Sequence, residues 1–257
     1  MKDLEIIQQQ KQYKILLVGD AGEDTYTYGN VNRLSPEAPV PVFEPVYDIV
    51  KEGMASNVYK NLTALGCLVT YVHTDVSKKK RLIDIRSKQQ LIRVDHDAEC
   101  KAVSYNFMTQ EEIAMYDAIV ISDYNKGTID YEILHHLIKV VTIPIFIDTK
   151  KTDLAQLNGC YIKINALEYS RATSKPHPEC LIVTRGEQGV TWNGFAFGAN
   201  TVEVSDVCGA GDTFLSALAY KFLETKSMPK SIVFANKAAA VTVQHVGVYA
   251  PRLEEIK

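Results

Sequence analysis

The second half of the chain alternates short apolar runs with longer segments in which apolar residues recur every three or four positions. The runs have the length of buried strands, and the longer segments have the period of amphipathic helices. A similar alternation occurs near the start of the chain. Strands are expected at 14–19, 68–72, 118–121, 143–147, 161–164 and 181–183, and helices at 55–65, 131–141, 212–223 and 229–245. Apolar strands separated by helices predict a mainly parallel sheet covered on both faces.

Between about residues 24 and 95 polar and apolar residues alternate instead, and prolines interrupt the apolar positions. The spacing of Val40, Val42, Val46 and Ile49 indicates half-exposed strands or an edge ribbon. Segments 81–86 and 89–94 have the alternation of a two-stranded ribbon. Such strands do not fit a sheet that is buried on both faces. We therefore predict an α/β fold of three layers, as one domain over residues 1–257, with a small β lid formed by segments at about 24–50 and 78–95.

The composition excludes several classes of protein. Of the 257 residues 46% are hydrophobic and 23% are charged, and the net charge of −3 gives no electrostatic support for binding nucleic acid. The five cysteines are scattered without a C-x-x-C pair, so neither a zinc site nor a disulfide framework is expected. The charged N-terminus lacks a signal-peptide core, and the longest mainly apolar segment, 140–147, is too short to span a membrane. A soluble cytoplasmic protein without membrane partners is expected.

Candidate chemistry is densest where a glycine turn runs directly into the helix expected at 212–223. Gly209, Ala210 and Gly211 are small enough for a ligand to approach the backbone, and the first N–H groups of a helix favour an anion such as phosphate. Asp212 follows at the junction. An acid beside a phosphate suggests removal of a proton from an attacking hydroxyl. The alternative is a helix N-terminus whose acid only complements the helix dipole.

Further polar residues follow the expected strands, at the edge where open parallel sheets bind ligands. A helix cap explains any one of them alone, whereas several in one sheet favour a site. Hydroxyl recognition suits Asp20, Asp24 and Asn57, hydrated magnesium suits Asn165 and Glu168, and close approach of a nucleotide suits Gly186 and Gly189. The chain lacks the G-x-x-x-x-G-K-[ST] loop, and no G-x-G-x-x-G follows the first strand. A Walker-type fold is thereby excluded and a dinucleotide fold is disfavoured.

Three motifs resemble those of the ribokinase-like (PfkB) carbohydrate kinases, and the likeness extends from about residue 13 to 251. They are D-x-x-G-A-G-D at 206–212, N-x-x-E at 165–168 and T-x-G at 184–186. Within that family the chain is most similar to kinase domains that act on D-glycero-β-D-manno-heptose 7-phosphate in lipopolysaccharide biosynthesis. Three stretches carry that closer likeness. They are Gly19-Asp20 with Asp24 and Tyr28-Gly29, the segment 33–42 with its unusual run S-P-E-A-P-V-P-V, and Q-Q-L-I-R-V-D at 89–95.

The resemblance implies an ATP-dependent phosphotransferase with a role for each motif. Asp212 would be the catalytic base, and Gly209, Ala210 and Gly211 would form the anion hole. Mg²⁺ would be held by Asn165 and Glu168 through water, and K⁺, which some members bind, would lie near Asp206. The nucleotide would be bordered by Thr184, Gly186, Gly189 and Asn236, and the sugar would be bound by Asp20 and Asn57, with Asp24 and Gly53 beside them. In relatives the lid also builds a homodimer.

Four departures from the family pattern keep other functions open. Met54 stands where relatives have a second glycine, Cys208 replaces a threonine, Thr149 replaces a proline, and the chain passes from Val72 to Lys78 where relatives carry roughly another helix and strand. One alternative is a non-catalytic nucleotide- or sugar-binding protein derived from such a kinase. Another is a kinase for a different small acceptor. The basic run at 78–81 is either a solvated face or a contact for a distal phosphate of the substrate, through Lys80, Arg81 or Arg86.

Overall fold

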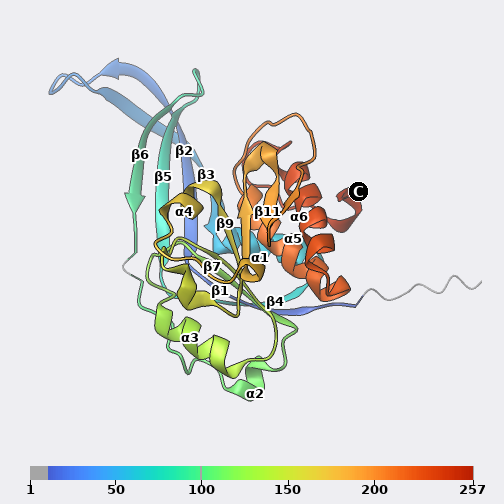
Figure 1. Ribbon diagram of the computed structural model, residues 1–257. Helices are drawn as coiled ribbons and strands as arrows, with labels where there is room; N and C mark the ends of the chain where they lie inside the picture. The colour runs from blue at the N-terminus through green and yellow to red at the C-terminus, as the bar shows by residue number, and fades with distance from the viewer. Residues whose placement is uncertain (1–10, 99, 257) are drawn as a thin grey trace, which may run out of the picture.

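A computed structural model describes residues 11–98 and 100–256, in which an eight-stranded sheet forms the centre of the molecule (Figure 1). Its strand order is β12-β11-β10-β9-β8-β7-β1-β4, and every pair from β10 to β4 is parallel, whereas β10, β11 and β12 pair antiparallel. The strands are β1 (Lys14–Gly19), β4 (Leu68–Val72), β7 (Ala118–Asp123), β8 (Ile145–Thr149), β9 (Tyr161–Asn165), β10 (Leu181–Thr184), β11 (Val190–Trp192) and β12 (Phe195–Phe197). The predicted mainly parallel sheet is confirmed.

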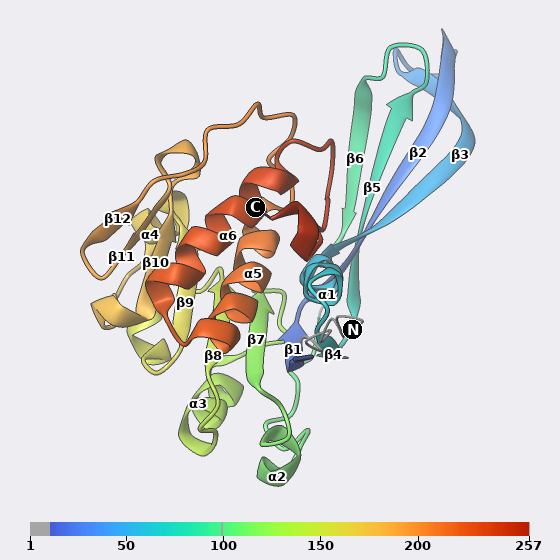
Figure 2. The same cartoon turned by 90° about the vertical axis from the view of Figure 1, so that its right-hand side faces the viewer.

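Helices cover both faces of this sheet (Figure 2). One face carries α1 (Ala55–Ala64), α5 (Ala210–Thr225) and α6 (Met228–Thr242), and the other carries α2 (Gln110–Ile113), α3 (Tyr131–Val140) and α4 (Ala166–Arg171). Four single turns of 3₁₀ helix lie at Leu154–Leu157, Pro178–Cys180, Gly186–Gln188 and Leu253–Glu255.

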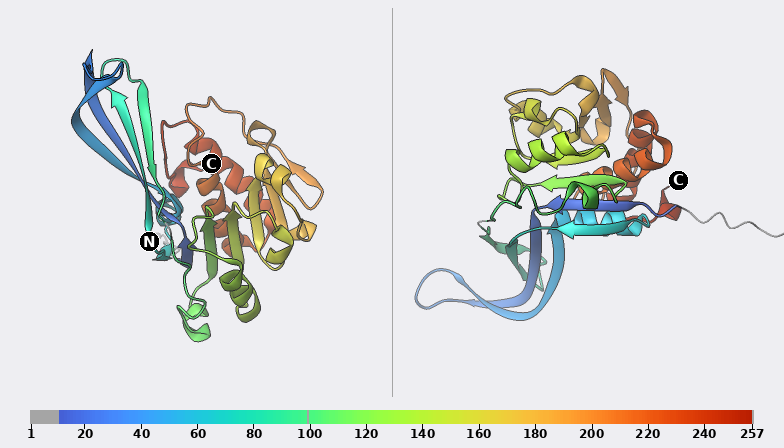
Figure 3. Two further views of the ribbon diagram at one scale, coloured as in Figure 1. Left: turned by 90° about the vertical axis from the view of Figure 1, so that its left-hand side faces the viewer. Right: turned by 90° about the horizontal axis from the view of Figure 1, so that it is seen from below.

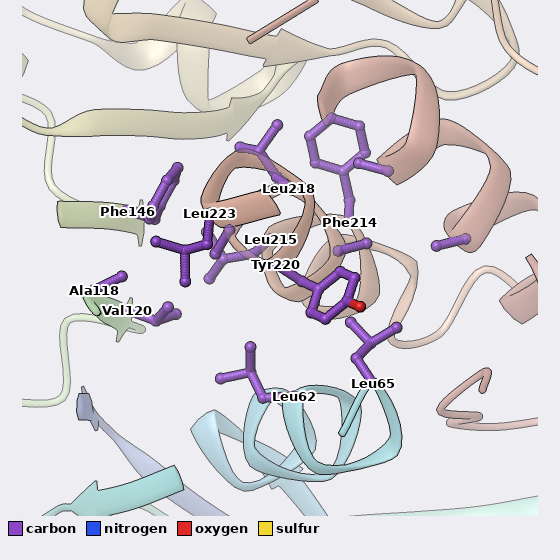
Figure 4. Packing of buried hydrophobic residues seen from close by; sticks show 14 of the residues in the cluster. Leu62, Leu65, Ala118, Val120, Phe146, Phe214, Leu215, Leu218, Tyr220 and Leu223 are labelled. Carbon is purple, nitrogen blue, oxygen red and sulfur yellow. The ribbon is translucent and has the colours of Figure 1, made fainter. Parts of the chain in front are cut away.

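Alternation along each strand divides the core between the two faces, since neighbouring side chains of a strand point in opposite directions. Ile15 and Leu17 of β1 pack toward α1 and α5, whereas Leu16 and Val18 pack toward α3. In Figure 4 the apolar side chains of α5, among them Leu215 and Leu223, lie beside Phe146 and Val120 of the sheet and above Leu62 of α1. The buried face of α5 thereby fixes the position of its first turn, where the site forms.

A second sheet of four strands projects from the body as a long ribbon (Figure 3). Its order is β3-β2-β5-β6, formed by β2 (Ala21–Leu34), β3 (Pro41–Met54), β5 (Val76–Asp84) and β6 (Gln90–His96). We call these four strands the lid sheet. Its strands overlap the segments expected to form a lid, and both β2 and β3 continue to the body without a loop, because β1 ends at Gly19 and α1 begins at Ala55.

The connection after β4 is short, as the sequence suggests. β4 ends at Val72 on the edge of the large sheet, and β5 of the lid sheet begins at Val76. The intervening residues, 73–75, contain neither helix nor strand. The edge of the large sheet therefore connects directly to the lid sheet.

No helix in the described part of the chain is long and apolar enough to cross a membrane. The charged N-terminal segment on which the expectation of no signal peptide rests lies outside the described residues.

Candidate active site

The carboxyl ends of the parallel strands converge on the first turn of α5, and Asp212 lies in that turn. Its side chain is buried, and both carboxylate oxygens accept a hydrogen bond from a distant part of the chain. Asn57 Nδ2, on α1, donates to Oδ2 at 2.7 Å, and the hydroxyl of Tyr124, just after β7, donates to Oδ1 at 3.0 Å. The predicted base is thus held by two donors, of which the sequence analysis expected only Asn57 at the site.

Burial changes the acidity of Asp212. Removal from water disfavours the charged form of Asp212, and the nearby charge of Asp148 disfavours it further; together they raise the pKa of Asp212 to about 6. Hydrogen bonds from Asn57 and Tyr124 and the charge of Lys163 act in the opposite direction. A carboxyl with this pKa is ionised at neutral pH but binds a proton more readily than an exposed aspartate. That property suits a general base.

The predicted anion cradle at 209–211 leads directly into α5. Gly209 precedes α5 with φ of +79°, a left-handed conformation in which a side chain is strained, and a Cβ there would lie 2.8 Å from Asn57 Nδ2. A Cβ on Gly211 would lie 2.8 Å from Lys163 Nζ. Both glycines, with Ala210 between them, therefore bring the backbone close to polar side chains, at the helix end that favours anions.

Lys163 is a functional candidate that the sequence analysis passed over. Its side chain is buried on β9, and Nζ lies 2.6 Å from Asp148 Oδ2 on β8. A buried cation beside Gly211 adds to the attraction of the cradle for phosphate. The available signal was a charged residue within the otherwise apolar run 161–164.

A cavity of about 510 Å³ opens beside the cradle, and its lining includes the residues predicted to border a nucleotide. Most of the remaining lining is apolar, which suits a purine ring. Asn236 Nδ2 donates to the carbonyl of Gly198 at 3.0 Å and so ties α6 to the segment after β12. The predicted residues on the cavity wall are Thr184, Gly186, Gly189, Asn236, Ala210 and Gly211.

The residues predicted to bind sugar have different surroundings. Asp20 is fully buried, and its carboxylate accepts the backbone N–H groups of Tyr124, Lys126 and Thr128 at 2.8, 3.1 and 3.2 Å. Its visible role is therefore to hold the loop after β7. Asp24 pairs with Arg81 at 2.6 Å within the lid sheet, and a Cβ on Gly53 would lie 2.7 Å from Asp24 Oδ2.

Asn165 and Glu168 form a reciprocal capping box at the start of α4. The Asn165 side chain accepts the Glu168 N–H at 2.9 Å, and Glu168 Oε2 accepts the Asn165 N–H at 2.7 Å. Glu168 Oε1 pairs with Lys150. This motif therefore caps a helix, as the alternative explanation stated. The ranges that the structure describes contain no cluster of three or more potential metal-ligating residues.

Magnesium fits this region through water rather than by direct ligation. Asp148 Oδ1 is buried and has no hydrogen-bond partner in the described chain, so it can accept a hydrogen bond from water of a hydrated ion. Asp206, the residue proposed for a monovalent cation, accepts the N–H groups of Cys208 and Gly247 at 2.9 and 2.8 Å, and these bonds lower its pKa.

Comparison with known proteins finds one matching family model and several similar bifunctional proteins. The pfkB family of carbohydrate kinases matches residues 146–256, which include the cradle, Asp212 and the cavity wall. The bifunctional protein HldE of Hydrogenovibrio crunogenus is 32% identical over 287 residues, which cover 91% of this chain and 60% of that protein. The C-terminal part of the chain, residues 146–256, thus matches the pfkB family of carbohydrate kinases.

The chain spans less than two thirds of the length of these bifunctional relatives. The HldE protein of Nitratiruptor is 32% identical over 301 residues, which cover 95% of this chain and 64% of that protein. Because the matched length exceeds the 257 residues of this chain, that relative carries residues in the matched region that this chain lacks.

Solved structures show the fold of the chain to be ribokinase-like. Ribokinase of Thermotoga maritima superposes with a TM-score of 0.70 at 16% identity, covering 95% of this chain and 98% of that one. Arabidopsis thaliana ribokinase, complexed with ribose and ATP, has a TM-score of 0.68 at 17% identity, covering 96% of this chain and 98% of that one. The predicted fold class is therefore confirmed.

Proposed function

We propose that this chain is an ATP-dependent kinase that phosphorylates a hydroxyl of a sugar or sugar phosphate, with a heptose 7-phosphate as the first acceptor to test. The observation that carries the proposal is the buried Asp212 at the N-terminus of α5, beside the glycine cradle and a cavity of about 510 Å³. The pfkB match over residues 146–256 supports the same chemistry. The acceptor is suggested by the HldE relatives and by the run at 35–42.

In the proposed reaction Asp212 accepts the proton of the acceptor hydroxyl as its oxygen attacks the γ-phosphorus of ATP. The bond between that phosphorus and the β,γ-bridging oxygen breaks, and ADP leaves. Backbone N–H groups of the cradle and the ammonium of Lys163 face the transferred group and stabilise the charge that develops on it. Bound Mg²⁺ would supply neutralisation of phosphate charge, and Asn165 and Glu168 would hold it through water.

The nucleotide and the acceptor would occupy opposite sides of the cradle. The apolar cavity beside Thr184 and Asn236 takes the base and ribose of ATP. The acceptor lies between Asn57 and the lid sheet, which closes over it. We further propose that the lid sheet builds a homodimer. A cytoplasmic location and a K⁺ site near Asp206 are also proposals.

A non-catalytic binding protein is the second candidate, and two features favour it. Met54 precedes α1 with φ of +55°, a left-handed backbone conformation that is strained for a residue other than glycine. The carboxylate of Asp20 is already occupied by three backbone N–H groups. Binding of ATP without phosphoryl transfer would support this candidate.

The test measures ADP release with Mg²⁺ and ATP over a panel of seven- and six-carbon sugars and sugar phosphates. We expect Asp212→Asn to lower kcat by about 10²–10⁴-fold, because a positioned base contributes that much. Affinity for ATP, measured by calorimetry, should stay near that of the wild type, since Asp212 would contact the acceptor.

The matched control is Asp117→Asn, at the end of β7 that is remote from the cradle, and it should keep wild-type turnover. Wild-type turnover in Asp212→Asn would refute the assignment of the base. Failure of the unaltered chain on every acceptor, with ATP binding intact, would favour the binding protein.

A further inference from the structure

Tyr124 makes a contact with Asp212 that the proposed function does not explain. It is the first residue after β7, it is partly buried, and its hydroxyl lies 3.0 Å from Asp212 Oδ1. Asn57 Nδ2, on α1, donates to the other oxygen, Oδ2, at 2.7 Å. One donor on each oxygen fixes the plane of the carboxylate, and each oxygen keeps a further lone pair for the proton of an acceptor.

The loop that carries Tyr124 is held in place by buried interactions. Asp20 accepts the backbone N–H of Tyr124 itself, and also those of Lys126 and Thr128. Asp123 Oδ1 accepts the N–H of Asn125 at 2.9 Å. With its backbone tied at alternate residues, the loop presents the Tyr124 ring in one orientation.

We propose that Tyr124 is a positioning residue for Asp212, holding Oδ1 through its hydroxyl, and that Asp20 acts through Tyr124 by fixing the loop that carries it. The inference rests on the proposed function, because it assigns a task in the same reaction. Its content is independent of which sugar is phosphorylated.

The direction of this hydrogen bond follows from the charges around it. Burial and the charge of Asp212 raise the pKa of Tyr124 well above its ordinary value, so the phenol stays protonated and donates. A donor to the ionised carboxylate favours the charged form and holds the pKa of Asp212 down against the effect of burial. Removal of the hydroxyl should therefore raise the pKa of Asp212.

Other groups that act on Asp212 come from every neighbouring element and stay the same in a Tyr124 variant. Asn57 donates from α1, Asp148 lies on β8 and opposes ionisation, and Lys163 on β9 favours it. The charge of Asp212 also interacts with Lys150, after β8, and with Cys208, before α5. The change in Asp212 titration therefore isolates the contribution of Tyr124.

The experiment compares Tyr124→Phe with the wild type and with Tyr131→Phe. Tyr131 is a matched control, because its hydroxyl donates to the Asp153 carbonyl at 3.2 Å and not to Asp212. The chain is labelled with ¹³C-carboxyl aspartate, and the resonance that Asp212→Asn removes is followed against pH. In parallel, kcat/KM is measured against pH for each form.

We expect the midpoint of the Asp212 titration to rise by about one pH unit in Tyr124→Phe, because the loss of one hydrogen bond to a charged group shifts a pKa by about that amount. The acid limb of kcat/KM should rise with it, and Tyr131→Phe should leave both unchanged. 3-Fluorotyrosine at position 124 keeps the shape of the side chain and is a stronger donor, so it should move the midpoint the opposite way even if Tyr124→Phe folds poorly.

An unmoved midpoint in Tyr124→Phe, or a uniform fall in kcat/KM without movement of the acid limb, would overturn the proposal and leave Tyr124 a structural residue. A wild-type chain that phosphorylates no acceptor would contradict the proposed function instead. The resonance titration needs no substrate, so it decides the inference in that case too.

Discussion

At the scale of single residues, Asp212 combines a functional environment with a cost in stability. Its pKa of about 6 compares with an ordinary value of 3.8. A difference of this size corresponds to about 3 kcal/mol between the two protonation states. Because the folded state holds the proton more tightly than the unfolded state, the cost is absent below pH 3.8, grows as pH rises through 6, and is fully present above it.

Asp212→Asn should therefore be more stable than the wild type at pH 7.5, with a free energy of unfolding that is higher by about 1–3 kcal/mol. The difference should shrink as pH falls toward 4, because the wild-type carboxyl is then protonated. Urea unfolding at both pH values measures it, with Asp117→Asn as the control. A difference that does not depend on pH would show that the charge of Asp212 is not its cause.

Sequence reasoning singled out the turn at the start of α5, whose residues form a local pattern, but it missed Tyr124 and Lys163. Gly209, Gly211 and Asp212 are neighbours in one turn, so their spacing carries their chemistry. Tyr124 is 88 positions from Asp212 and Lys163 lies inside an apolar strand. Their roles depend on strand order, which single-sequence patterns do not specify.

At the scale of elements, the site depends on the close approach of β9 to the first turn of α5. Gly211 permits that approach, since its missing side chain leaves room for Lys163 Nζ. Gly211→Ala should displace the ammonium from Asp148 and lower kcat on the order of 10²-fold, as loss of one group stabilising the transferred charge does. Steady-state kinetics at saturating ATP measures this effect.

Gly198→Ala is the matched control for that variant, because a Cβ at Gly198 meets no atom within 4 Å. It should retain kcat. Equal activity of Gly211→Ala and wild type would indicate that the Lys163–Asp148 pair has no part in phosphoryl transfer.

The strands of the large parallel sheet and the long helices were predictable, whereas the short helices were not. The strand at 14–19 and the helix beginning at Ala55 agree with the pattern, and Gly66, with φ of +84°, follows the end of that helix. α2 has four residues and α4 has six, which is too short for a helical period to show. α4 instead depends on its capping box, which the sequence analysis interpreted as a magnesium motif.

At the scale of the whole molecule, the lid sheet has two different faces. Strand register places Tyr26 and Arg81 on one side, together with Asp24 and its ion pair. The opposite side carries exposed valine and isoleucine side chains. Burial of these side chains against a second copy of the chain would prevent aggregation through this face. These are Val46, Val50, Ile92 and Val94.

Val94→Asp should weaken the proposed homodimer at least tenfold, since it would bury a charge in an apolar contact. Sedimentation velocity over a range of protein concentrations measures this. Val233→Asp, on α6, is the control, because Val233 is 48% exposed and Val94 is 49% exposed. A wild-type monomer, or a dimer that Val94→Asp leaves intact, would exclude this face as the interface.

The central claim is phosphoryl transfer to a sugar hydroxyl, and ³¹P NMR of the reaction mixture tests it most directly. ATP, Mg²⁺ and the heptose 7-phosphate are incubated with the unaltered chain, with the other sugars of the panel tested in turn. The account predicts ADP together with an equal amount of a new sugar phosphate ester. ADP accompanied only by inorganic phosphate, or ATP that stays intact with every acceptor, would contradict it.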